Sequence, residues 1–464
     1  MKKLLWVLFL GLFCSLTNGQ DITGAWNGAL DIQGTQLRLV LHLSKTDAGY
    51  TGTLDSPDQQ AFGIPIDSTA FANNRLHFKL AQLGITYEGT FAEKQFTGTF
   101  TQGGMALPLS LSREEIAKKE LRRPQEPKAP FPYHTEDVTF KNTEAEISLA
   151  ATLTLPKAEG VHPVVILISG SGPQDRNEEL MGHKPFLVLA DHLTRKGIGV
   201  LRYDDRGTAK STGDFSAATT ADLATDAASA IAYLKTRKDV DPTKIGLMGH
   251  SEGGVIAPMV AANNNDVSYI VLLAGTGIRG DKLLILQGDL IQQASGISEK
   301  ERSLHTGTRA AIFDKVLHAK NTETLKAEIT TYLEDRLEKH PIIVPEGVDK
   351  AQFIQVNVTQ FSSPWMQHFI KYDPALHLEK VGCPVLALNG EKDLQVPAKL
   401  NLEAIAAALA KGGNTAVTTV AFPKLNHLFQ EAETGSPSEY ASIEQTFAPE
   451  ALAVLTDWIL TQVQ

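Results

Sequence analysis

Short runs in which apolar and polar residues alternate fill the chain from residue 21 to residue 112. A period of two places successive side chains on opposite faces of a β-strand, and turn residues separate the runs from one another. The clearest runs span residues 26–30, 37–43, 50–54, 87–91 and 96–100. An aromatic-x-Gly-Thr unit occurs at Tyr50, Tyr87 and Phe96, which indicates a reused hairpin. This pattern predicts a small antiparallel β-domain, a barrel or a sandwich, over residues 20–112.

The pattern changes beyond residue 135, where apolar runs alternate with stretches of helical period. Two runs at 138–140 and 147–155 indicate an opening hairpin, and continuous apolar runs such as 164–168 are typical of strands that are buried on both faces. Strands that alternate with helices form α/β domains. Residues 136–464 are therefore predicted to form an α/β domain.

Proline residues crowd the boundary between these two regions. Four prolines fall within the nine residues 124–132. Closely spaced prolines hold a chain extended and semi-rigid. We expect residues 113–135 to be a linker, with a helical stretch over 113–121 in front of the prolines.

A helical pattern of roughly one hundred residues interrupts the α/β region before Cys383, far more than a strand-to-helix connection needs. Its predicted helices span residues 282–295, 299–318 and 322–339. An insertion of this size, about residues 278–375, predicts a cap that covers an active site, excludes water and sets the shape of the substrate. Within it Trp365, Phe369 and Tyr372 share one helical face. A stripe of this kind is more often buried in a core than part of a pocket wall; the functional interpretation is that these three residues contact substrate.

Residues 249–253 read Gly-His-Ser-Glu-Gly, a G-x-S-x-G motif. An apolar run at 244–248 precedes the motif and a small-residue helical pattern follows it, which places Ser251 on the turn between a strand and a helix. Such a turn strains the backbone of the serine and brings strand and helix close together, and Gly249 and Gly253 leave the space that it needs. The motif in this context predicts that Ser251 is a nucleophile.

A serine hydroxyl becomes nucleophilic when a base takes its proton and an acid orients the base. Asp393 follows the apolar run 384–388, and His427 follows the last predicted strand, 416–422. Both residues lie just past the carboxyl end of a strand, where open α/β sheets hold their sites. The order Ser251, Asp393, His427 predicts a catalytic triad of nucleophile, acid and base.

Three further side chains near the triad carry titratable groups. Glu391 lies in the same post-strand turn as Asp393 and is the alternative acid. His250 stands beside Ser251, but one histidine suffices to take the proton, so we expect His250 to pack beside the turn and to point away from the site. The Glu252 side chain is expected at the N-terminus of the helix, where the helix dipole favours a negative charge.

Acyl transfer also needs N–H donors that face the developing oxyanion. The backbone N–H of Glu252 is one candidate, because it opens the helix after the serine. The second is expected in the glycine-rich loop 169–173, with the N–H of Ser171 first and that of Gly170 next. This loop lacks the third glycine of a dinucleotide fingerprint and the Lys-Ser/Thr of a P-loop, so no nucleotide cofactor is predicted.

Five segments together resemble a known family. They are Ser-Gly-Ser-Gly-Pro at 169–173, Arg-Tyr-Asp-Asp-Arg-Gly at 202–207, Gly-His-Ser-Glu-Gly-Gly at 249–254, Asn-Gly-Glu-Lys-Asp at 389–393 and Asn-His at 426–427. Over roughly residues 136–464 the chain resembles the secreted α/β-hydrolases related to EstD-type carboxylesterases and the serine aminopeptidase-like (S33-type) group. The resemblance implies an eight-stranded, mostly parallel sheet, a Ser-Asp-His triad and esterase activity on short acyl chains. The loop reads Ser169-Gly170 where many relatives carry His-Gly, which leaves the second oxyanion donor open.

The N-terminus has the three parts of a secretory signal. Lys2 and Lys3 form a cationic head, residues 4–12 form an apolar core too short to span a bilayer, and residues 17–19 are small or polar. We expect a signal peptide over residues 1–19 and a secreted or periplasmic protein.

The chain holds two cysteines, and only Cys383 remains once the leader is removed, so no internal disulfide is predicted. Cys14 raises the question of a lipoprotein anchor. Phe13 occupies the position before it, where a lipidation signal needs a small residue, which argues against the anchor. Beyond the leader, no other segment is predicted to cross a membrane.

Charge narrows the range of partners. The sequence holds 43 Lys and Arg against 53 Asp and Glu, a net charge of −10 that becomes −12 when the two leader lysines are removed. Affinity for phosphate backbones rests on clustered basic residues, which this chain lacks, so nucleic acid is not expected as a partner. No residue cluster has zinc or calcium ligand spacing, and neither a metal nor an organic cofactor is predicted.

Together these patterns predict a secreted serine hydrolase that cleaves small-molecule carboxylic esters through an acyl-enzyme. One alternative is a peptidase or aminopeptidase on small peptides, in which an acidic cap residue, Asp289, Glu334 or Asp335, binds the free amine of the substrate. Another is a carbohydrate- or lipid-binding protein in which the β-domain binds and the hydrolase domain is an inactive scaffold. The residues of the β-domain predict no particular partner.

Overall fold

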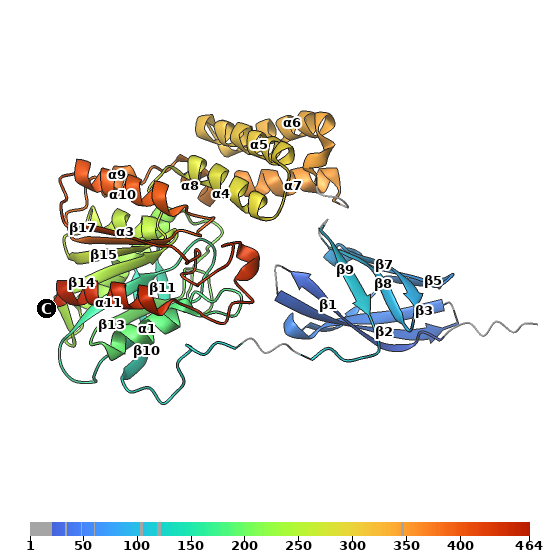
Figure 1. Ribbon diagram of the computed structural model, residues 1–464, viewed down its shortest axis with the longest axis horizontal. Helices are drawn as coiled ribbons and strands as arrows, with labels where there is room; N and C mark the ends of the chain where they lie inside the picture. The colour runs from blue at the N-terminus through green and yellow to red at the C-terminus, as the bar shows by residue number, and fades with distance from the viewer. Residues whose placement is uncertain are drawn as a thin grey trace, which may run out of the picture. The chain divides into compact units, whose positions relative to one another are not determined.

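The computed structural model describes residues 21–32, 35–47, 49–59, 61–102, 105–117, 122–344 and 348–464. The chain divides into two compact units, a smaller one that ends at residue 118 and a larger one that follows it (Figure 1). The expected signal peptide over residues 1–19, with Cys14, lies outside the described residues. Among the described helices, none is both long and apolar enough to cross a membrane.

The N-terminal unit is an antiparallel sheet whose strands follow one another in chain order. They are β1 (Gly24–Ile32), β2 (Thr35–Thr46), β3 (Gly49–Ser56), β4 (Ala61–Pro65), β5 (Ser68–Ala72), β6 (Arg75–Leu80), β7 (Ile85–Ala92), β8 (Gln95–Gln102) and β9 (Met105–Leu111). Both β4 and β5 pair with β3, and every other strand pairs with the next. Asn27 of β1 and Ser112, which follows β9, exchange backbone hydrogen bonds of 2.7 and 2.9 Å. This bridge closes the sheet, so the unit is a barrel and not a two-sheet sandwich.

Aromatic side chains fill the interior of the barrel. Phe78 and Tyr87 stack with ring centroids 5.2 Å apart, and Trp26 meets Phe96 edge-on at 4.7 Å. All four are at most 2% exposed. A Cβ on Gly98, one of the glycines in the repeated motif, would collide with the backbone of the neighbouring strand β7. The motif therefore marks places where two strands approach closely around a packed core.

The segment between the barrel and the α/β region differs from the prediction in two ways. Residues 113–117 are irregular and not helical, and residues 118–121 lie outside the described part of the chain. The stretch that follows is bound to the catalytic unit: the guanidinium of Arg123 donates to the carbonyls of Met181, Ala441 and Ile443 at 2.8–3.1 Å. The proline-rich stretch is thus fixed along the surface of this unit and is not a free spacer.

The larger unit has one sheet of eight strands. They are β10 (His134–Asn142), β11 (Ile147–Leu155), β12 (His162–Ile168), β13 (Gly199–Tyr203), β14 (Val240–His250), β15 (Val267–Leu273), β16 (Val385–Gly390) and β17 (Val417–Phe422). Their order is β10-β11-β13-β12-β14-β15-β16-β17. The opening hairpin β10–β11 is antiparallel, β11 pairs antiparallel with β13, and all later pairs are parallel. This is the α/β-hydrolase fold that the sequence predicted.

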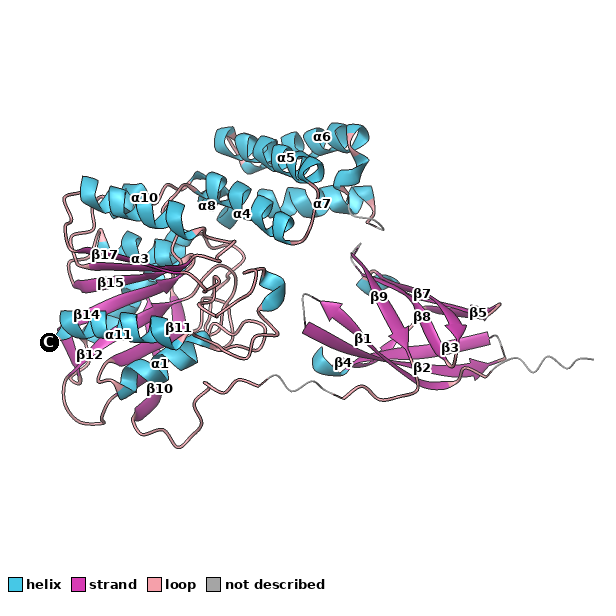
Figure 2. Cartoon of the chain, in the orientation of Figure 1, coloured by secondary structure: helices cyan, strands magenta, loops and turns pink. Residues whose placement is uncertain are grey.

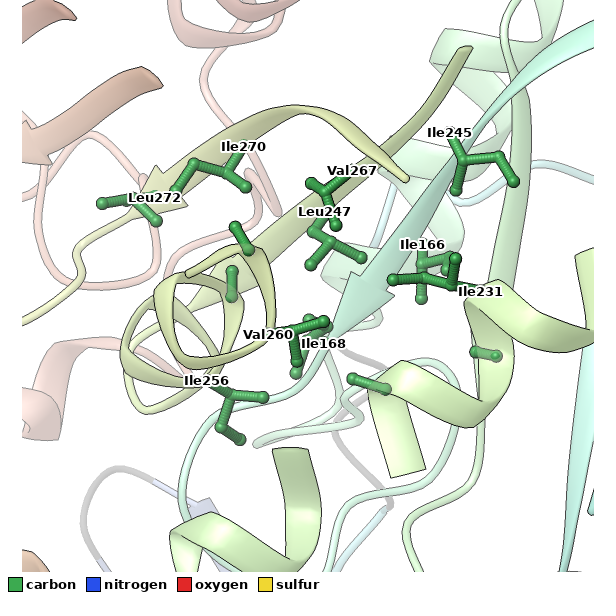
Figure 3. Packing of buried hydrophobic residues seen from close by; sticks show 14 of the residues in the cluster. Ile166, Ile168, Ile231, Ile245, Leu247, Ile256, Val260, Val267, Ile270 and Leu272 are labelled. Atoms are coloured by element: carbon green, nitrogen blue, oxygen red, sulfur yellow. The ribbon is translucent and has the colours of Figure 1, made fainter. Parts of the chain in front are cut away.

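Helices cover both faces of this sheet. They are α1 (Pro185–Arg195), α2 (Thr220–Lys235), α3 (Gly253–Ala261), α9 (Ala375–Leu378), α10 (Ala398–Lys411) and α11 (Pro449–Val463). Ile166 and Ile168 of β12 belong to the cluster that includes residues of α2 and α3, and Figure 3 shows them with Leu247 of the adjacent β14. Val165 and Leu167 belong to the cluster on the other face, with residues of α1 and α11. The continuous apolar run is explained by burial on both faces.

Five helices between β15 and β16 form a separate group, the cap (Figure 2). They are α4 (Gly280–Ala294), α5 (Glu299–His318), α6 (Thr322–Lys339), α7 (Lys350–Phe361) and α8 (Pro364–Lys371). The side chains of Ser298, Asn321, Asp349 and Ser363 accept hydrogen bonds from the first turns of α5 to α8, which explains where these helices begin. The bounds of α5 and α6 are those predicted. The cap has a hydrophobic core of its own.

Candidate active site

Ser251 lies on the tight turn between β14 and α3. Its backbone has φ of +52°, a left-handed conformation that a side chain other than glycine adopts at a cost. A Cβ on Gly249 would collide with the carbonyl of Gly253, and a Cβ on Gly253 would collide with the carbonyl of Ile168. The turn therefore needs both glycines, as the motif predicted. The Ser251 N–H donates to the carbonyl of Leu273 at 2.8 Å, which fixes the turn against β15.

His427 and Asp393 form a buried pair in the loops that follow β17 and β16. His427 Nδ1 lies 2.7 Å from Asp393 Oδ2. The other carboxylate oxygen of Asp393 accepts the N–H groups of Gln395 and Val396, each at 2.8 Å. The carboxylate is thus held from both sides and aimed at the imidazole. Glu391, the alternative acid, is exposed and makes no such contact with the histidine in the described structure.

Ser251 and His427 line one cavity of about 340 Å³. Among the described residues, the Ser251 hydroxyl makes no hydrogen bond with His427. Such contacts are often long in an unliganded site and shorten when substrate binds. Much of the apolar lining comes from the cap helices α4 and α8 and from the loops after β16 and β17: Leu283, Leu284, Trp365, Phe369, Val396 and Leu428. The arrangement brings a candidate nucleophile and a candidate base to one apolar cavity.

The three candidate oxyanion donors differ in what they already bind. The backbone N–H groups of Glu252 and Ser171 donate to no acceptor within the described chain. The N–H of Gly170, in contrast, donates to Glu178 Oε1 at 2.7 Å. A donor that already serves a buried carboxylate is not available to an oxyanion. The geometry therefore favours Glu252 and Ser171, and it argues against Gly170.

The Glu252 side chain does not cap the helix that it precedes. It is 2% exposed, and its Oε1 accepts hydrogen bonds from the Thr220 hydroxyl at 2.7 Å and from Trp365 Nε1 at 2.8 Å. Burial raises the pKa of this carboxyl, and the hydrogen bonds partly oppose the rise. The expected helix-dipole role is thus replaced by a link between the nucleophile turn and the cap helix α8.

Two of the three residues in the predicted aromatic stripe line the cavity, and the third does not. Trp365 and Phe369 line the cavity and stack with ring centroids 5.1 Å apart. Tyr372 does not belong to the lining: its hydroxyl lies 2.8 Å from His377 Nδ1. The prediction that Tyr372 contacts substrate is therefore not supported. Helical period placed the three residues on one face, but α8 ends at Lys371, so Tyr372 falls outside the helix.

His250 and Glu178 are both part of the site, although His250 was expected to point away from it and Glu178 was not among the candidates. His250 lines the same cavity as Ser251, contrary to the expectation that it points away. Its Nδ1 lies 2.9 Å from Glu178 Oε1. Glu178 follows the glycine-rich loop by a few residues and belongs to no motif. The one signal that could have found it is the run of polar residues at 174–179, directly after a strand end where sites gather.

The acidic cap residues considered for amine binding do not line the cavity. Asp289 pairs with Arg302 at 3.0 Å, and Asp335 pairs with Lys339 at 2.7 Å. Glu334 is exposed. These three residues therefore lack the placement that recognition of a substrate amine in this cavity would need.

Comparison with known proteins shows which family and which relatives the chain resembles. The model of the X-Pro dipeptidyl-peptidase (S15) family matches residues 145–416, more than half of the chain. Esterase EstD of Thermotoga maritima is 26% identical over 348 residues, which cover 74% of each chain. An uncharacterized 31.7 kDa protein in the traX-finO intergenic region of Escherichia coli is 26% identical over 329 residues, 69% of this chain and 98% of its own.

Among solved structures, an esterase of Pyrococcus furiosus is similar with a TM-score of 0.43 and 15% identity, over 75% of this chain and 100% of its own. The residues that the family model matches include the nucleophile turn and the cap helices, and they end before His427. By that match over residues 145–416, the chain belongs to the X-Pro dipeptidyl-peptidase (S15) family of α/β-hydrolases.

Proposed function

We propose that the protein is an exported serine carboxylesterase that cleaves small esters with short acyl chains. One observation carries the proposal: Ser251, held in a strained turn, lines the same apolar cavity as His427, whose Nδ1 is bound by the buried Asp393 at 2.7 Å. Similarity to an esterase supports the choice of an ester as substrate. The expected leader over residues 1–19 supports export. Fractionation of cells that produce the full chain tests this: protein outside the cytoplasm supports export, and protein found inside the cytoplasm contradicts it.

The chemistry follows from the arrangement of these groups. Asp393 accepts the Nδ1–H of His427, which leaves Nε2 free to take the proton of the Ser251 hydroxyl. The serine oxygen then attacks the ester carbonyl, and the N–H groups of Glu252 and Ser171 stabilise the oxyanion. His427 returns the proton to the leaving alcohol. Water, activated by the same imidazole, hydrolyses the acyl-enzyme and releases the acid.

A peptidase is the alternative that the family description favours. An aminopeptidase needs an anionic group to bind the free amine of its substrate. Glu178 is the carboxylate among the residues that line the described cavity, and its Oε1 already serves His250 and the N–H of Gly170. The cavity therefore supports an uncharged substrate better than a peptide with a free N-terminus.

Rates on matched substrates separate these two functions. We expect the mature chain to hydrolyse p-nitrophenyl esters from acetate to hexanoate with a kcat/KM at least about 100-fold higher than for aminoacyl p-nitroanilides. The difference arises because the cavity offers no free carboxylate to pair with the charged amine of the anilides. The panel extends to p-nitrophenyl laurate to locate the chain-length limit. Equal efficiency on the anilides would move the assignment to a peptidase, and no turnover of either class would contradict the proposed enzyme.

Trp365→Ala tests whether the cap wall sets chain length. Removal of the indole widens the cavity, so kcat/KM for octanoate relative to butyrate esters is expected to rise about tenfold. The side chain is half-buried, and we expect a smaller effect on Tm than on this ratio. Tyr372→Phe is the matched control, because Tyr372 lies on the same segment but outside the cavity lining. An unchanged ratio with a large fall in Tm would show that Trp365 only supports the fold.

A further inference from the structure

Glu178 and His250 form a buried pair beside the candidate triad that the proposed chemistry does not use. Their side chains are 6% and 9% exposed, and His250 Nδ1 lies 2.9 Å from Glu178 Oε1. Glu178 has φ of +50°, so its backbone is held in a conformation that is costly for a side chain of this size. Strain and burial together indicate that the surrounding contacts fix this carboxylate in one place.

The hydrogen bonds around the pair define its charge. His250 Nε2 lies 3.0 Å from the backbone carbonyl of His427, which can only accept a hydrogen bond. His250 Nδ1 faces Glu178 Oε1, which also accepts the N–H of Gly170 at 2.7 Å. Both ring nitrogens therefore face acceptors, and both are satisfied only when each carries a proton. The arrangement fits an imidazolium bound to a carboxylate.

The pair joins the three segments that the reaction needs. Glu178 binds the residue next to Ser171, His250 precedes Ser251 in the chain, and His250 binds the backbone of His427. We propose that the Glu178–His250 ion pair is a positioning clamp that holds oxyanion donor, nucleophile and base at their working distances. The proposal rests on the proposed ester hydrolysis, because it assigns the pair to that site. Neither residue touches the reacting atoms; both act through their neighbours.

The charge of His250 depends on the groups packed around it. Burial alone lowers the pKa of His250, but the Glu178 carboxylate, the hydrogen bonds to Glu178 and to the His427 carbonyl, and the charge of Asp393 together raise it above the ordinary value. Asp205 is a buried carboxyl that interacts with Glu178: burial raises its pKa to about 8, hydrogen bonds from the Gln174 N–H and the Ser169 hydroxyl oppose the rise, and the charges of Glu178 and Glu252 add to it. Because the folded-state pKa of His250 is raised, the clamp is present at low pH and is lost as the pH rises through that pKa.

We therefore expect kcat to fall as the pH rises through the pKa of His250. This fall is the alkaline limb of the pH profile. Above its pKa, neutral His250 keeps one of its two donated hydrogen bonds, and the three segments are held less firmly. Glu178→Gln keeps the shape of the side chain and its acceptor for the Gly170 N–H, but it removes the charge that stabilises the imidazolium. The variant is therefore expected to lose kcat and to move the alkaline limb to lower pH.

The test measures kcat and KM for p-nitrophenyl butyrate against pH in the full chain. For Glu178→Gln we expect kcat to fall about 10- to 100-fold at neutral pH, KM to stay within about twofold, and the alkaline limb to move down by at least about one pH unit. Glu178→Asp keeps a carboxylate and is expected to keep the limb near its wild-type position. Glu179→Gln is the matched control, because Glu179 is the exposed neighbour in the chain. A folded Glu178→Gln protein with wild-type kcat and an unmoved limb would overturn the clamp.

His250→Gln tests the clamp if Glu178→Gln does not fold. It also shows whether the alkaline limb comes from His250 or from Asp205. Its amide can still donate to the His427 carbonyl but cannot titrate, so the alkaline limb is expected to disappear; a limb that persists would overturn the proposal. Wild-type protein that fails to hydrolyse the ester would refute the proposed function and not the pair. In that case ¹⁵N-histidine NMR still reports the pair: we expect one ring, absent in His250→Gln, that keeps both nitrogens protonated to a higher pH than an exposed histidine does, and a ring that is neutral throughout would contradict the clamp.

Discussion

Replacing Asp393 by Asn is expected to lower kcat for p-nitrophenyl butyrate by about 10⁴-fold, with KM nearly unchanged. Asp393 Oδ1 accepts the N–H groups of Gln395 and Val396, so an Asn side chain must keep its oxygen on that side. Its NH₂ group then faces His427 Nδ1, at the position where the carboxylate accepts a proton. The imidazole is forced to carry its proton on Nε2 and can no longer take the proton of Ser251.

The neighbouring acid supplies a matched control for this variant. Glu391 lies in the same turn but is exposed, so Glu391→Gln is expected to leave kcat within about twofold of the wild type. Steady-state rates and thermal unfolding of both variants are measured side by side. A folded Asp393→Asn protein with full kcat, or an equal loss in Glu391→Gln, would show that Asp393 does not orient the base.

Ser251→Ala is expected to lower kcat by about 10⁶-fold, the largest effect of any substitution in this site. The variant has no oxygen that can attack the ester, while the cavity and the donors at Glu252 and Ser171 remain. A residual rate above that of water alone is therefore expected from these groups. Alanine and serine adopt a positive φ at similar cost, so the strained turn and Tm should change little.

Much of the fold and of the candidate site could be predicted because the signals lie close together in the chain. Two-residue alternation indicated the barrel, and continuous apolar runs indicated strands buried on both faces. The glycines of the nucleophile turn were predictable because a side chain at either position would collide with backbone. Asp393 and His427 could be placed together because parallel strands end at one edge of the sheet.

The features that were missed depend on contacts between distant segments. The N-terminal unit is a barrel and not a sandwich because of one bridge between Asn27 and Ser112. These residues are far apart in the sequence, so a short stretch of sequence does not predict their contact. Gly170 was a candidate oxyanion donor, but the Glu178 carboxylate, eight residues later in the chain, accepts its N–H. Tyr372 was assigned to the cavity by helical period, which does not tell where the helix ends. The fixed course of the proline-rich stretch likewise depends on Arg123 and its distant carbonyl partners.

The claim that Ser251 forms the acyl-enzyme is tested most directly by covalent labelling. The protein and its Ser251→Ala variant are incubated with an alkyl fluorophosphonate, which reacts with activated serines, and the site of the added mass is mapped by peptide mass spectrometry. We predict one adduct on the peptide that contains Ser251, together with loss of p-nitrophenyl butyrate hydrolysis, and no adduct in the variant. An unlabelled Ser251 peptide in active wild-type protein, or an equal adduct and rate in the variant, would contradict the account.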